Sequence, residues 1–344
     1  MTQQTSPSRR FASRWIITAL LLMAVAIGAC TFLRQSKPAP SGGDQAIKVR
    51  IGYLPIAADL PLFVANEQGY FTKHGVAVEM IRFESSPLMG TAFVNNSLDV
   101  AASISTTVAL STESRDPGKF RIFMVDANTP EAPLSAMLTM PDSGISRVED
   151  LRNKKVGIFP GSNAALVFGL VFKKHGLDPK KDMTLVELPQ SSQLQALSGK
   201  QIDALCTWEP IATQAVLDYK AVNFNSGAVE REIINPYNAG VWLLSSDFSR
   251  KHPNTSIQLV EAFEEALDYM RNNPGPAKKA LVTYASVAPH VADKVECTQF
   301  WKVGEVRNEI LQQFTDIVQG AGVINKRIDA PSLLLNHAEL SKQQ

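Results

Sequence analysis

Hydrophobic and polar positions occur in the same order twice along the chain. The first copy holds three strand patterns separated by two helical ones. They cover, in order, residues 49–54 (strand), 60–74 (helix), 76–83 (strand), a further helical stretch, and 97–101 (the start of a strand). Strands that alternate with helices of this length predict a parallel sheet with right-handed crossovers.

The second copy has the same elements, displaced so that Lys174 corresponds to Lys73. They cover residues 155–159 (strand), 163–175 (helix), 184–188 (strand), a further helical stretch, and 201–205 (the start of a strand). Asp99 and Asp203 stand at the turn into the third strand of each copy, where a carboxylate is expected to accept free backbone N–H groups. Two α/β lobes are therefore predicted, each built as β-α-β-α-β.

Both copies end their first helix with Lys-His-Gly. Gly75 and Gly176 fall where a left-handed residue is expected after the last helical turn. His74 and His175 then lie at the negative end of a helix dipole, a position that favours basic side chains. We interpret both histidines as helix-capping residues rather than as metal ligands or catalysts.

A mainly helical region follows the second copy. "GVWLLS" at 240–245 is typical of a buried strand, and 256–273 carries an apolar stripe with helical spacing that Pro274 and Pro276 terminate. The short helices predicted beyond it have no strands between them. They must therefore pack on an existing lobe, and the simplest topology returns the chain to the first one.

This topology fixes the expected domain boundaries. The first lobe takes residues 47–134 and 238–335, and the second lobe takes residues 135–237. The chain then crosses between the lobes twice, near 128–133 and near 235–239. Two such connections between α/β lobes predict a hinged cleft.

The N-terminus differs from the rest of the chain. Arginines at 9, 10 and 14 precede an apolar run at 15–29 that is shorter than the roughly 20 residues of a membrane span and suits a signal-peptide core. The run ends in Ile-Gly-Ala-Cys, the pattern of a bacterial lipobox. We expect a signal peptide at 1–29, lipidation at Cys30 and a tether at 30–46. An uncleaved anchor helix is the alternative, and general export is favoured over the twin-arginine route.

Composition and charge indicate a globular protein and give no reason to expect a nucleic-acid partner. Of 344 residues 45% are hydrophobic, enough for packed cores, and 34 basic residues against 33 acidic ones give a net charge of +1. Such a balance gives no general field for nucleic acid. Cys206 and Cys297 stand among apolar residues, and we expect them to be unpaired.

The motifs of common enzymes and cofactor sites are missing from the sequence. It has neither a Walker loop nor G-x-G-x-x-G after a strand, so no nucleotide is indicated. Its five histidines are scattered, and it has no H-E-x-x-H or G-x-S-x-G motif. We therefore expect no metal, no cofactor and no enzyme activity, and binding remains as the function.

In an open parallel sheet, ligands bind at the carboxyl ends of the strands, where loops lead into helix N-termini. The loops at these ends are rich in Ser, Thr, Asn and Gln, which donate hydrogen bonds. They comprise residues 55–61, 84–87, 103–107, 161–164, 189–192 and 207–210. Together they form a predicted recognition surface.

The sequence resembles the substrate-binding proteins of bacterial ABC importers, in the group that includes nitrate, sulfonate, taurine and thiamine-pyrimidine binders. The resemblance spans residues 49 to about 331. Its carriers are "IGYLPIAADLPLFVANEQGYFTKHGVAVEM", "NSLDVAAS", "VEDLRNKKVGIFPGSN", "HGLDP" and "GKQIDALCTWEP". The resemblance implies a type 2 periplasmic-binding-protein fold that closes on a solute and delivers it to a permease and its ATPase.

The resemblance also implies site residues. Asp59, Leu60 and Pro61 occupy a loop where the family often has His-x-Pro. The carboxylate of Asp59 disfavours a bare anion and favours a ligand that offers N–H, O–H or positive charge. Its alternative role is to cap the following helix.

The other carried-over residues are mostly polar. Those that match cleft positions of the family are Ser85, Ser86, Ser105, Thr106, Ser162, Asn163, Ala164, Gln190 and Asn238. Trp208 and Glu209, with Pro210, match a W-D/E-P element at the end of a second-lobe strand. Trp208 either stacks on a flat ligand or packs beneath its loop, and Glu209 either bonds the ligand or joins the lobes.

The sequence thus predicts an extracytoplasmic, lipid-anchored, monomeric solute-binding protein of an ABC importer. Two solute classes stay open: sulfonates and other oxyanions, which helix N-termini and hydroxyls favour, and pyrimidine-like heterocycles, which Asp59, Trp208 and Glu209 favour. The alternatives are an extracytoplasmic sensor and an enzyme of thiamine-pyrimidine metabolism on the same fold.

Overall fold

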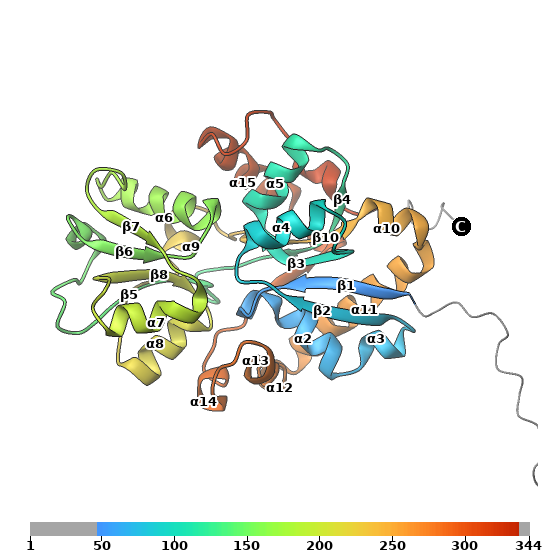
Figure 1. Cartoon of the computed structure of the whole chain (residues 1–344), viewed down its shortest axis with the longest axis horizontal. Coiled ribbons are helices and arrows are strands. Elements are labelled where there is room, and N and C mark those ends of the chain that lie inside the picture. Colours follow the sequence, from blue (N-terminus) through green and yellow to red (C-terminus); the bar gives the residue numbers. More distant parts are fainter. Residues whose placement is uncertain (1–46, 337–344) are drawn as a thin grey trace, which may run out of the picture. The chain divides into compact units, whose positions relative to one another are not determined.

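The computed structural model describes residues 47–336, which belong to one compact unit. The expected signal peptide, the tether and the lipidation site at Cys30 lie outside the described residues. Within 47–336, no helix combines the length and apolar character that a membrane crossing requires. Strands and helices of this unit are organised around two sheets (Figure 1).

The first sheet has six strands in the order β11-β4-β10-β3-β1-β2. Its strands are β1 (Lys48–Tyr53), β2 (Ala77–Arg82), β3 (Val100–Ser105), β4 (Phe120–Asp126), β10 (Gly240–Ser245) and β11 (Phe300–Lys302). Strand β1 runs parallel to β2 and β3, as predicted. The sheet is nevertheless mixed, because β10 enters antiparallel between β3 and β4.

The second sheet has five strands in the order β7-β6-β8-β5-β9. Its strands are β5 (Ser135–Thr139), β6 (Lys155–Ile158), β7 (Thr184–Glu187), β8 (Ala204–Trp208) and β9 (Val222–Ser226). Strand β6 is parallel to β7 and β8, whereas β5 is antiparallel to both of its neighbours. In the first sheet, β11 at the edge is also antiparallel to its neighbour β4. The strands that arrive from the other sheet, β10 in the first and β5 in the second, are both antiparallel to their two neighbours, and their entry produces the two crossovers.

Helices surround each of the two sheets (Figure 1). We call the first sheet with its helices the first lobe, and the second sheet with its helices the second lobe. Around the first sheet lie η1 (Ala57–Asp59), α2 (Leu60–Glu67), α3 (Tyr70–Lys73), α4 (Ser86–Val94), α5 (Thr106–Arg115), α10 (Ser246–Lys251), α11 (Pro253–Asn272), α12 (Pro274–Lys278), α13 (Ala280–Tyr284), α14 (Pro289–Ala292), η3 (Val303–Glu305), α15 (Asn308–Gly320) and η4 (Ala330–Leu333). Around the second sheet lie η2 (Val148–Leu151), α6 (Ser162–Lys174), α7 (Gln190–Ser198), α8 (Ile211–Tyr219) and α9 (Ala228–Glu232).

One predicted helix is wrong in its extent. The helix expected over 60–74 is two helices, α2 and α3, because Gly69 between them adopts a left-handed conformation with φ 72°. A residue in that conformation interrupts the helical hydrogen-bond ladder. The strand at 240–245 is confirmed as β10, and the long tail helix begins three residues earlier than expected, at Pro253.

The turn residues shared by the two copies behave alike. Asp99 accepts hydrogen bonds from the backbone N–H and the guanidinium of Arg50, and Asp203 accepts one from the backbone N–H of Lys155 at 2.8 Å. Both aspartates thus join the start of the third strand to the first strand of their copy. Their predicted role as acceptors of backbone N–H groups is confirmed.

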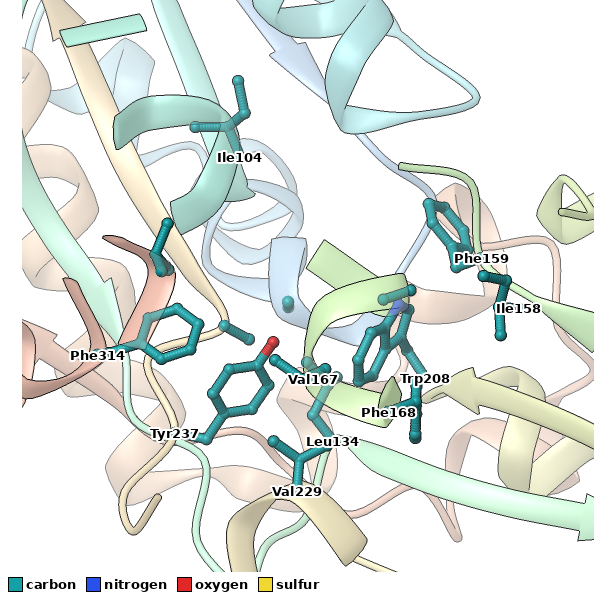
Figure 2. Close-up of a cluster of buried hydrophobic side chains, with 14 of the residues drawn as sticks. Ile104, Leu134, Ile158, Phe159, Val167, Phe168, Trp208, Val229, Tyr237 and Phe314 are labelled. Carbon is teal, nitrogen blue, oxygen red and sulfur yellow. The ribbon is translucent and has the colours of Figure 1, made fainter. Parts of the chain in front are cut away.

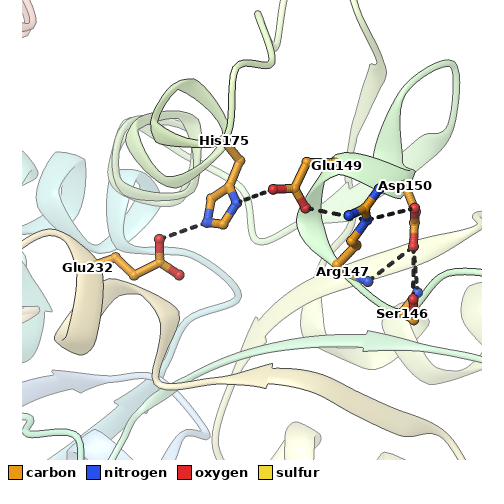
Figure 3. Close-up of polar contacts among 6 residues, drawn as sticks. All are labelled: Ser146, Arg147, Glu149, Asp150, His175 and Glu232. Carbon is orange, nitrogen blue, oxygen red and sulfur yellow. Dashed lines mark hydrogen bonds and ion pairs between the residues drawn. The ribbon is translucent and has the colours of Figure 1, made fainter.

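The capping interpretation of the two histidines is also confirmed. His74 and His175 are the C-cap residues of α3 and α6. Each is followed by a glycine, Gly75 or Gly176, whose φ angle of 74° or 71° is left-handed. The His175 ring also lies between two carboxylates, with Nδ1 2.8 Å from Glu149 and Nε2 2.9 Å from Glu232 (Figure 3). Both contacts raise the pKa of His175, although part-burial opposes them.

Aromatic side chains pack where the chain crosses between the lobes. Tyr237, on the second crossover, is buried; its ring makes an edge contact with Phe314 of α15 and lies 6.4 Å from Trp208 (Figure 2). Trp208 in turn stacks on Phe168 of α6 at 5.0 Å. One hydrophobic cluster therefore continues from one lobe into the other. The crossovers run side by side there, since Asn128 and Tyr237 form an antiparallel bridge.

Candidate functional site

A small cavity lies between the lobes, at the carboxyl ends of parallel strands in both sheets. Its volume is about 40 Å³. Its walls comprise Leu54, Ile56, Ala58, Ser86, Pro87, Ser103, Ser105, Asp126, Ala239 and Gly240 from the first lobe and second crossover, and Leu134, Phe159, Pro160, Gly161, Asn163, Ala164 and Trp208 from the first crossover and second lobe. Ligands of open α/β sheets bind at this end of the strands.

Asp126 forms the floor of the cavity on the first-lobe side. It is the last residue of β4 and is fully buried. Oδ2 accepts a hydrogen bond from the Ser103 hydroxyl at 2.8 Å, and Oδ1 accepts one from the Trp242 indole N–H at 3.2 Å. Burial raises the pKa of Asp126 to about 7, even though these hydrogen bonds and one from the Gly240 backbone oppose the shift.

Asp59 is a second buried carboxylate behind this floor. Its Oδ2 accepts a hydrogen bond from the Leu54 backbone N–H at 3.1 Å, and its Oδ1 has no partner among the described residues. Burial raises its pKa, and the nearby charge of Asp126 adds to the rise. The helix-capping interpretation of Asp59 is wrong, because its side chain bonds no N–H of α2. Nor does Asp59 line the cavity.

Gly240 leaves room beside the Asp126 carboxylate. A Cβ at this position would lie 2.5 Å from Ser103 Oγ and 2.6 Å from Asp126 Oδ2, closer than Cβ atoms approach. A side chain would therefore displace the hydrogen-bonded pair, since the interior is packed to near-crystal density. The first residue of β10 has to be glycine for Asp126 and Ser103 to face the cavity together.

The second-lobe wall is aromatic and amide in character. Asn163, in the first turn of α6, donates from Nδ2 to the Tyr237 hydroxyl at 2.8 Å, while its Oδ1 has no described partner. Phe159 and Trp208 form the apolar part of this wall. Trp208 stacks on Phe168 with one face and borders the cavity as well, so packing and ligand contact are both open to it.

Three hydrogen bonds join the lobes around the cavity. Ala57 N–H donates to the Glu209 carbonyl at 3.1 Å, and Gln190 Nε2 donates to the Pro55 carbonyl at 2.8 Å. Ser162 donates to Thr107 at 3.3 Å. These contacts hold the lobes against one another, so the structure represents a closed arrangement of the cleft.

The structure brings together five of the residues expected from the sequence. Ser86, Ser105, Asn163, Ala164 and Trp208 line the cavity. The others lie outside its lining, namely Asp59, Leu60, Pro61, Ser85, Thr106, Ser162, Gln190, Glu209 and Asn238. Most of these are buried in the surrounding framework.

Several outlying residues support the site from behind. Thr106 donates its hydroxyl hydrogen to the Asn238 carbonyl at 2.7 Å, and Asn238 Nδ2 donates to the Asp126 carbonyl at 2.7 Å. Glu209 accepts from the backbone and hydroxyl of Thr213, and burial raises its pKa to about 7. Its carboxylate thus organises the start of α8, while its carbonyl is the group that joins the lobes.

Sequence reasoning missed Asp126, Gly240 and Phe159, and it included Ser103 only as part of the predicted loop 103–107. The signal for Asp126 was its place at the end of the apolar run "FRIFMVD", directly before the first crossover. A carboxylate in such a strand is costly to bury and therefore noteworthy. Among residues 47–336, no group of His, Cys, Asp and Glu could hold a metal ion, and Cys206 and Cys297 are free thiols.

A model of the NMT1-like family matches residues 42–285. The chain belongs to the NMT1-like family. That match covers both crossovers and every residue of the cavity wall. The resemblance to this group of binding proteins is therefore confirmed.

Curated relatives of the chain are distant. A putative aliphatic sulfonates-binding protein of Bacillus subtilis is 24% identical over 86% of this chain and 88% of its own length. The nitrate import ATP-binding protein NrtC of Synechocystis is also 24% identical, over 74% of this chain. The match spans only 39% of NrtC.

Solved structures share the fold. The alkanesulfonate-binding protein SsuA of Xanthomonas axonopodis, bound to MOPS, superposes with a TM-score of 0.69 at 19% identity, over 84% of this chain and 98% of that one. The desulfurization enzyme DSZB superposes with a TM-score of 0.61 at 16% identity, over 86% and 98% of the two chains. The predicted two-lobe periplasmic-binding-protein fold is confirmed.

Proposed function

We propose that this chain is the extracytoplasmic solute-binding component of an ABC importer. It captures a small solute between its lobes and delivers that solute to a membrane permease. The observation that carries the proposal is the cavity itself, whose walls come from both lobes and from the two crossovers. A ligand there contacts the second lobe only when the cleft closes, so it stabilises the closed state by that difference.

The known relatives support the transport role. One is named for binding aliphatic sulfonates, and NrtC is named as an ATP-binding protein of nitrate import. An ATPase and a permease are therefore the proposed partners of this chain. From the sequence, Cys30 is the proposed point of lipid attachment, which would anchor the protein to a membrane, outside the cytoplasm, as a monomer.

Binding without chemistry fits the composition of the cavity wall. Neither described cysteine lines it, and among residues 47–336 no histidine does so. Serine hydroxyls are present, but none has an adjacent histidine to act as a general base. DSZB, which shares the fold, is named as a desulfurization enzyme, so an enzymatic desulfurization activity is the competing function to exclude.

Mass spectrometry of the purified protein tests the proposal. The chain starting after Cys30 is expressed, and small molecules released by denaturation are identified. Calorimetry with each identified compound then gives its affinity. We expect one compound to be recovered unchanged and to bind in stoichiometric amount. Conversion of that compound into a product during incubation would overturn the proposal in favour of an enzyme.

Small-angle X-ray scattering provides an independent readout. Addition of the recovered compound is expected to reduce the radius of gyration, since the lobes close around it. A control titration with an unrelated solute should leave the radius unchanged. A ligand that binds without compaction would contradict capture between the lobes.

A further inference from the structure

The cavity is acidic on one side and has no basic group to balance it. Among the residues that the structure describes, no Lys, Arg or His lines the cavity, and none forms an ion pair with Asp126 or Asp59. An uncompensated buried carboxylate is costly. A ligand that brings positive charge, or several N–H donors, would remove that cost on binding.

The Asp126 carboxylate has capacity left for such a ligand. It accepts from the Ser103 hydroxyl, the Trp242 indole and the Gly240 backbone. An ionised carboxylate offers about four lone-pair positions, so these three donors leave about one free. The missing Cβ of Gly240 keeps Oδ2 uncovered on the side that borders the cavity.

The opposite wall presents an acceptor too. Asn163 uses its Nδ2 on the Tyr237 hydroxyl, and its Oδ1 is buried without a donor among the described residues. Buried polar atoms are nearly always paired, so an unpaired acceptor beside a cavity indicates a missing donor. The two lobes therefore both offer hydrogen-bond acceptors, Asp126 Oδ2 from one side and Asn163 Oδ1 from the other.

We propose that the solute carries a protonated amine, amidine or guanidine group, or an equivalent N–H-rich edge, and that Asp126 and Asn163 together receive it. This inference rests on the proposed function and names the class of solute for the same site. It separates this chain from relatives named for nitrate and sulfonates, because an oxyanion would place like charge beside a buried carboxylate. A volume of about 40 Å³ admits a head group of a few heavy atoms.

Calorimetry with matched probes tests the charge selection. Methylguanidinium and 4-aminopyrimidine represent the proposed class, while nitrate and methanesulfonate represent the anions, all at pH 8 and constant ionic strength. We expect the first pair to bind at least tenfold more tightly than the second. Asp126→Asn is expected to weaken methylguanidinium binding at least tenfold, whereas the exposed Asp142→Asn should leave it unchanged.

Each other outcome contradicts the inference. Tighter binding of nitrate or methanesulfonate would assign the cavity to anions. If potassium chloride alone stabilised the protein as much as methylguanidinium does, Asp126 would be assigned to binding of a metal cation. If no probe of the proposed class binds, the class is wrong as well. Should Asp126→Asn fail to fold, as judged by circular dichroism, the ranking of the four probes on the unmodified protein decides the question.

The results that would contradict the proposed function differ from those that would contradict the solute class. An anion that binds and compacts the protein would contradict the charge selection but keep the solute-binding role. Absence of any co-purified compound, together with turnover of an added one, would contradict the solute-binding role itself. The scattering and mass-spectrometry experiments therefore separate the two failures.

Discussion

The two lobes share a strand order but supply different chemistry to the cavity between them. The sequence β2-β1-β3 followed by an antiparallel strand in the first lobe corresponds to β7-β6-β8 followed by β5 in the second. Yet the first lobe contributes Asp126 and three serine hydroxyls, whereas the second contributes Phe159, Trp208 and the amide of Asn163. The repeat preserves the framework and leaves the binding surface free to differ.

This difference predicts a division of roles. A buried carboxylate costs stability, and in the proposed site Asp126 serves recognition, whereas a stacked tryptophan stabilises the fold. Replacement of the Asp126 carboxylate should therefore alter ligand choice without loss of stability, whereas truncation of the second-lobe wall should make the protein unfold more readily. The following substitutions test that division.

The largest effect is expected in the pH dependence of unfolding. Burial raises the pKa of Asp126 from 3.8 to about 7, so the folded state holds this proton over a range where the unfolded state has released it. The contribution of Asp126 to stability is present below pH 4 and is lost as the pH rises to 7. The stability of Asp126→Asn relative to the unmodified protein should therefore increase by about 4 kcal/mol between pH 4 and pH 8.

Urea unfolding of both proteins across this pH range measures the difference. Asp142→Asn serves as a control of opposite sign, because the Lys200 ammonium lowers the pKa of Asp142, whose contribution appears as the pH rises. A pH profile of Asp126→Asn that runs parallel to that of the unmodified protein would show that Asp126 does not pay a burial cost.

A smaller loss is expected from Trp208→Ala. Trp208 is 7% exposed and stacks on Phe168, so its removal leaves a cavity in the cluster that joins the lobes. We expect the free energy of unfolding to fall by about 3 kcal/mol. Trp301→Ala is the matched control, since Trp301 is half-buried beside Arg307 and its loss should cost less. Equal losses in urea unfolding would contradict a structural role for the second-lobe wall.

The smallest effect on stability is expected from Gly240→Ala. The added methyl group meets Ser103 and Asp126 at about 2.5 Å, and relief of that clash should cost about 2 kcal/mol. Methylguanidinium binding should be lost at the same time, because the methyl covers Asp126 Oδ2. Gly275→Ala is the control, since a Cβ there meets no atom within 4 Å. A Gly240→Ala protein with unchanged stability in thermal denaturation and unchanged affinity would contradict the close approach.

The fold could be predicted from the sequence because its signals are local and occur twice. The Lys-His-Gly motif ends its helix through a left-handed glycine within a few residues. The turn aspartates Asp99 and Asp203 bond the backbone of the adjacent strand. The predicted helix at 60–74 was wrong in its extent, because a single left-handed residue at Gly69 interrupts a hydrophobic pattern that is otherwise continuous. Antiparallel entry of β10 and β5 could not be seen, since strand direction depends on the path between the lobes.

The site was predicted only in part because its key contacts are distant in sequence. Ser86, Ser105 and Asn163 stand at or next to helix N-termini that follow strand ends, and that position alone placed them at the cavity. Asp126 faces Ser103 and Gly240, residues that β-sheet pairing across 23 and more positions brings together. Glu209 and Gln190 matched the family pattern, yet in the structure they join the lobes beside the cavity and do not line it.

The paired crossovers restrict how the cleft can open. Asn128 and Tyr237 exchange backbone hydrogen bonds of 3.1 and 2.8 Å, and the Asn128 side chain adds a third to the Tyr237 carbonyl. A two-strand strap tied in this way bends readily across its width but resists sliding and twisting of one strand past the other. In the proposed closing motion we therefore expect essentially one mechanical freedom, a swing about the strap, that returns Asp126 and Asn163 to the same relative position at each closure.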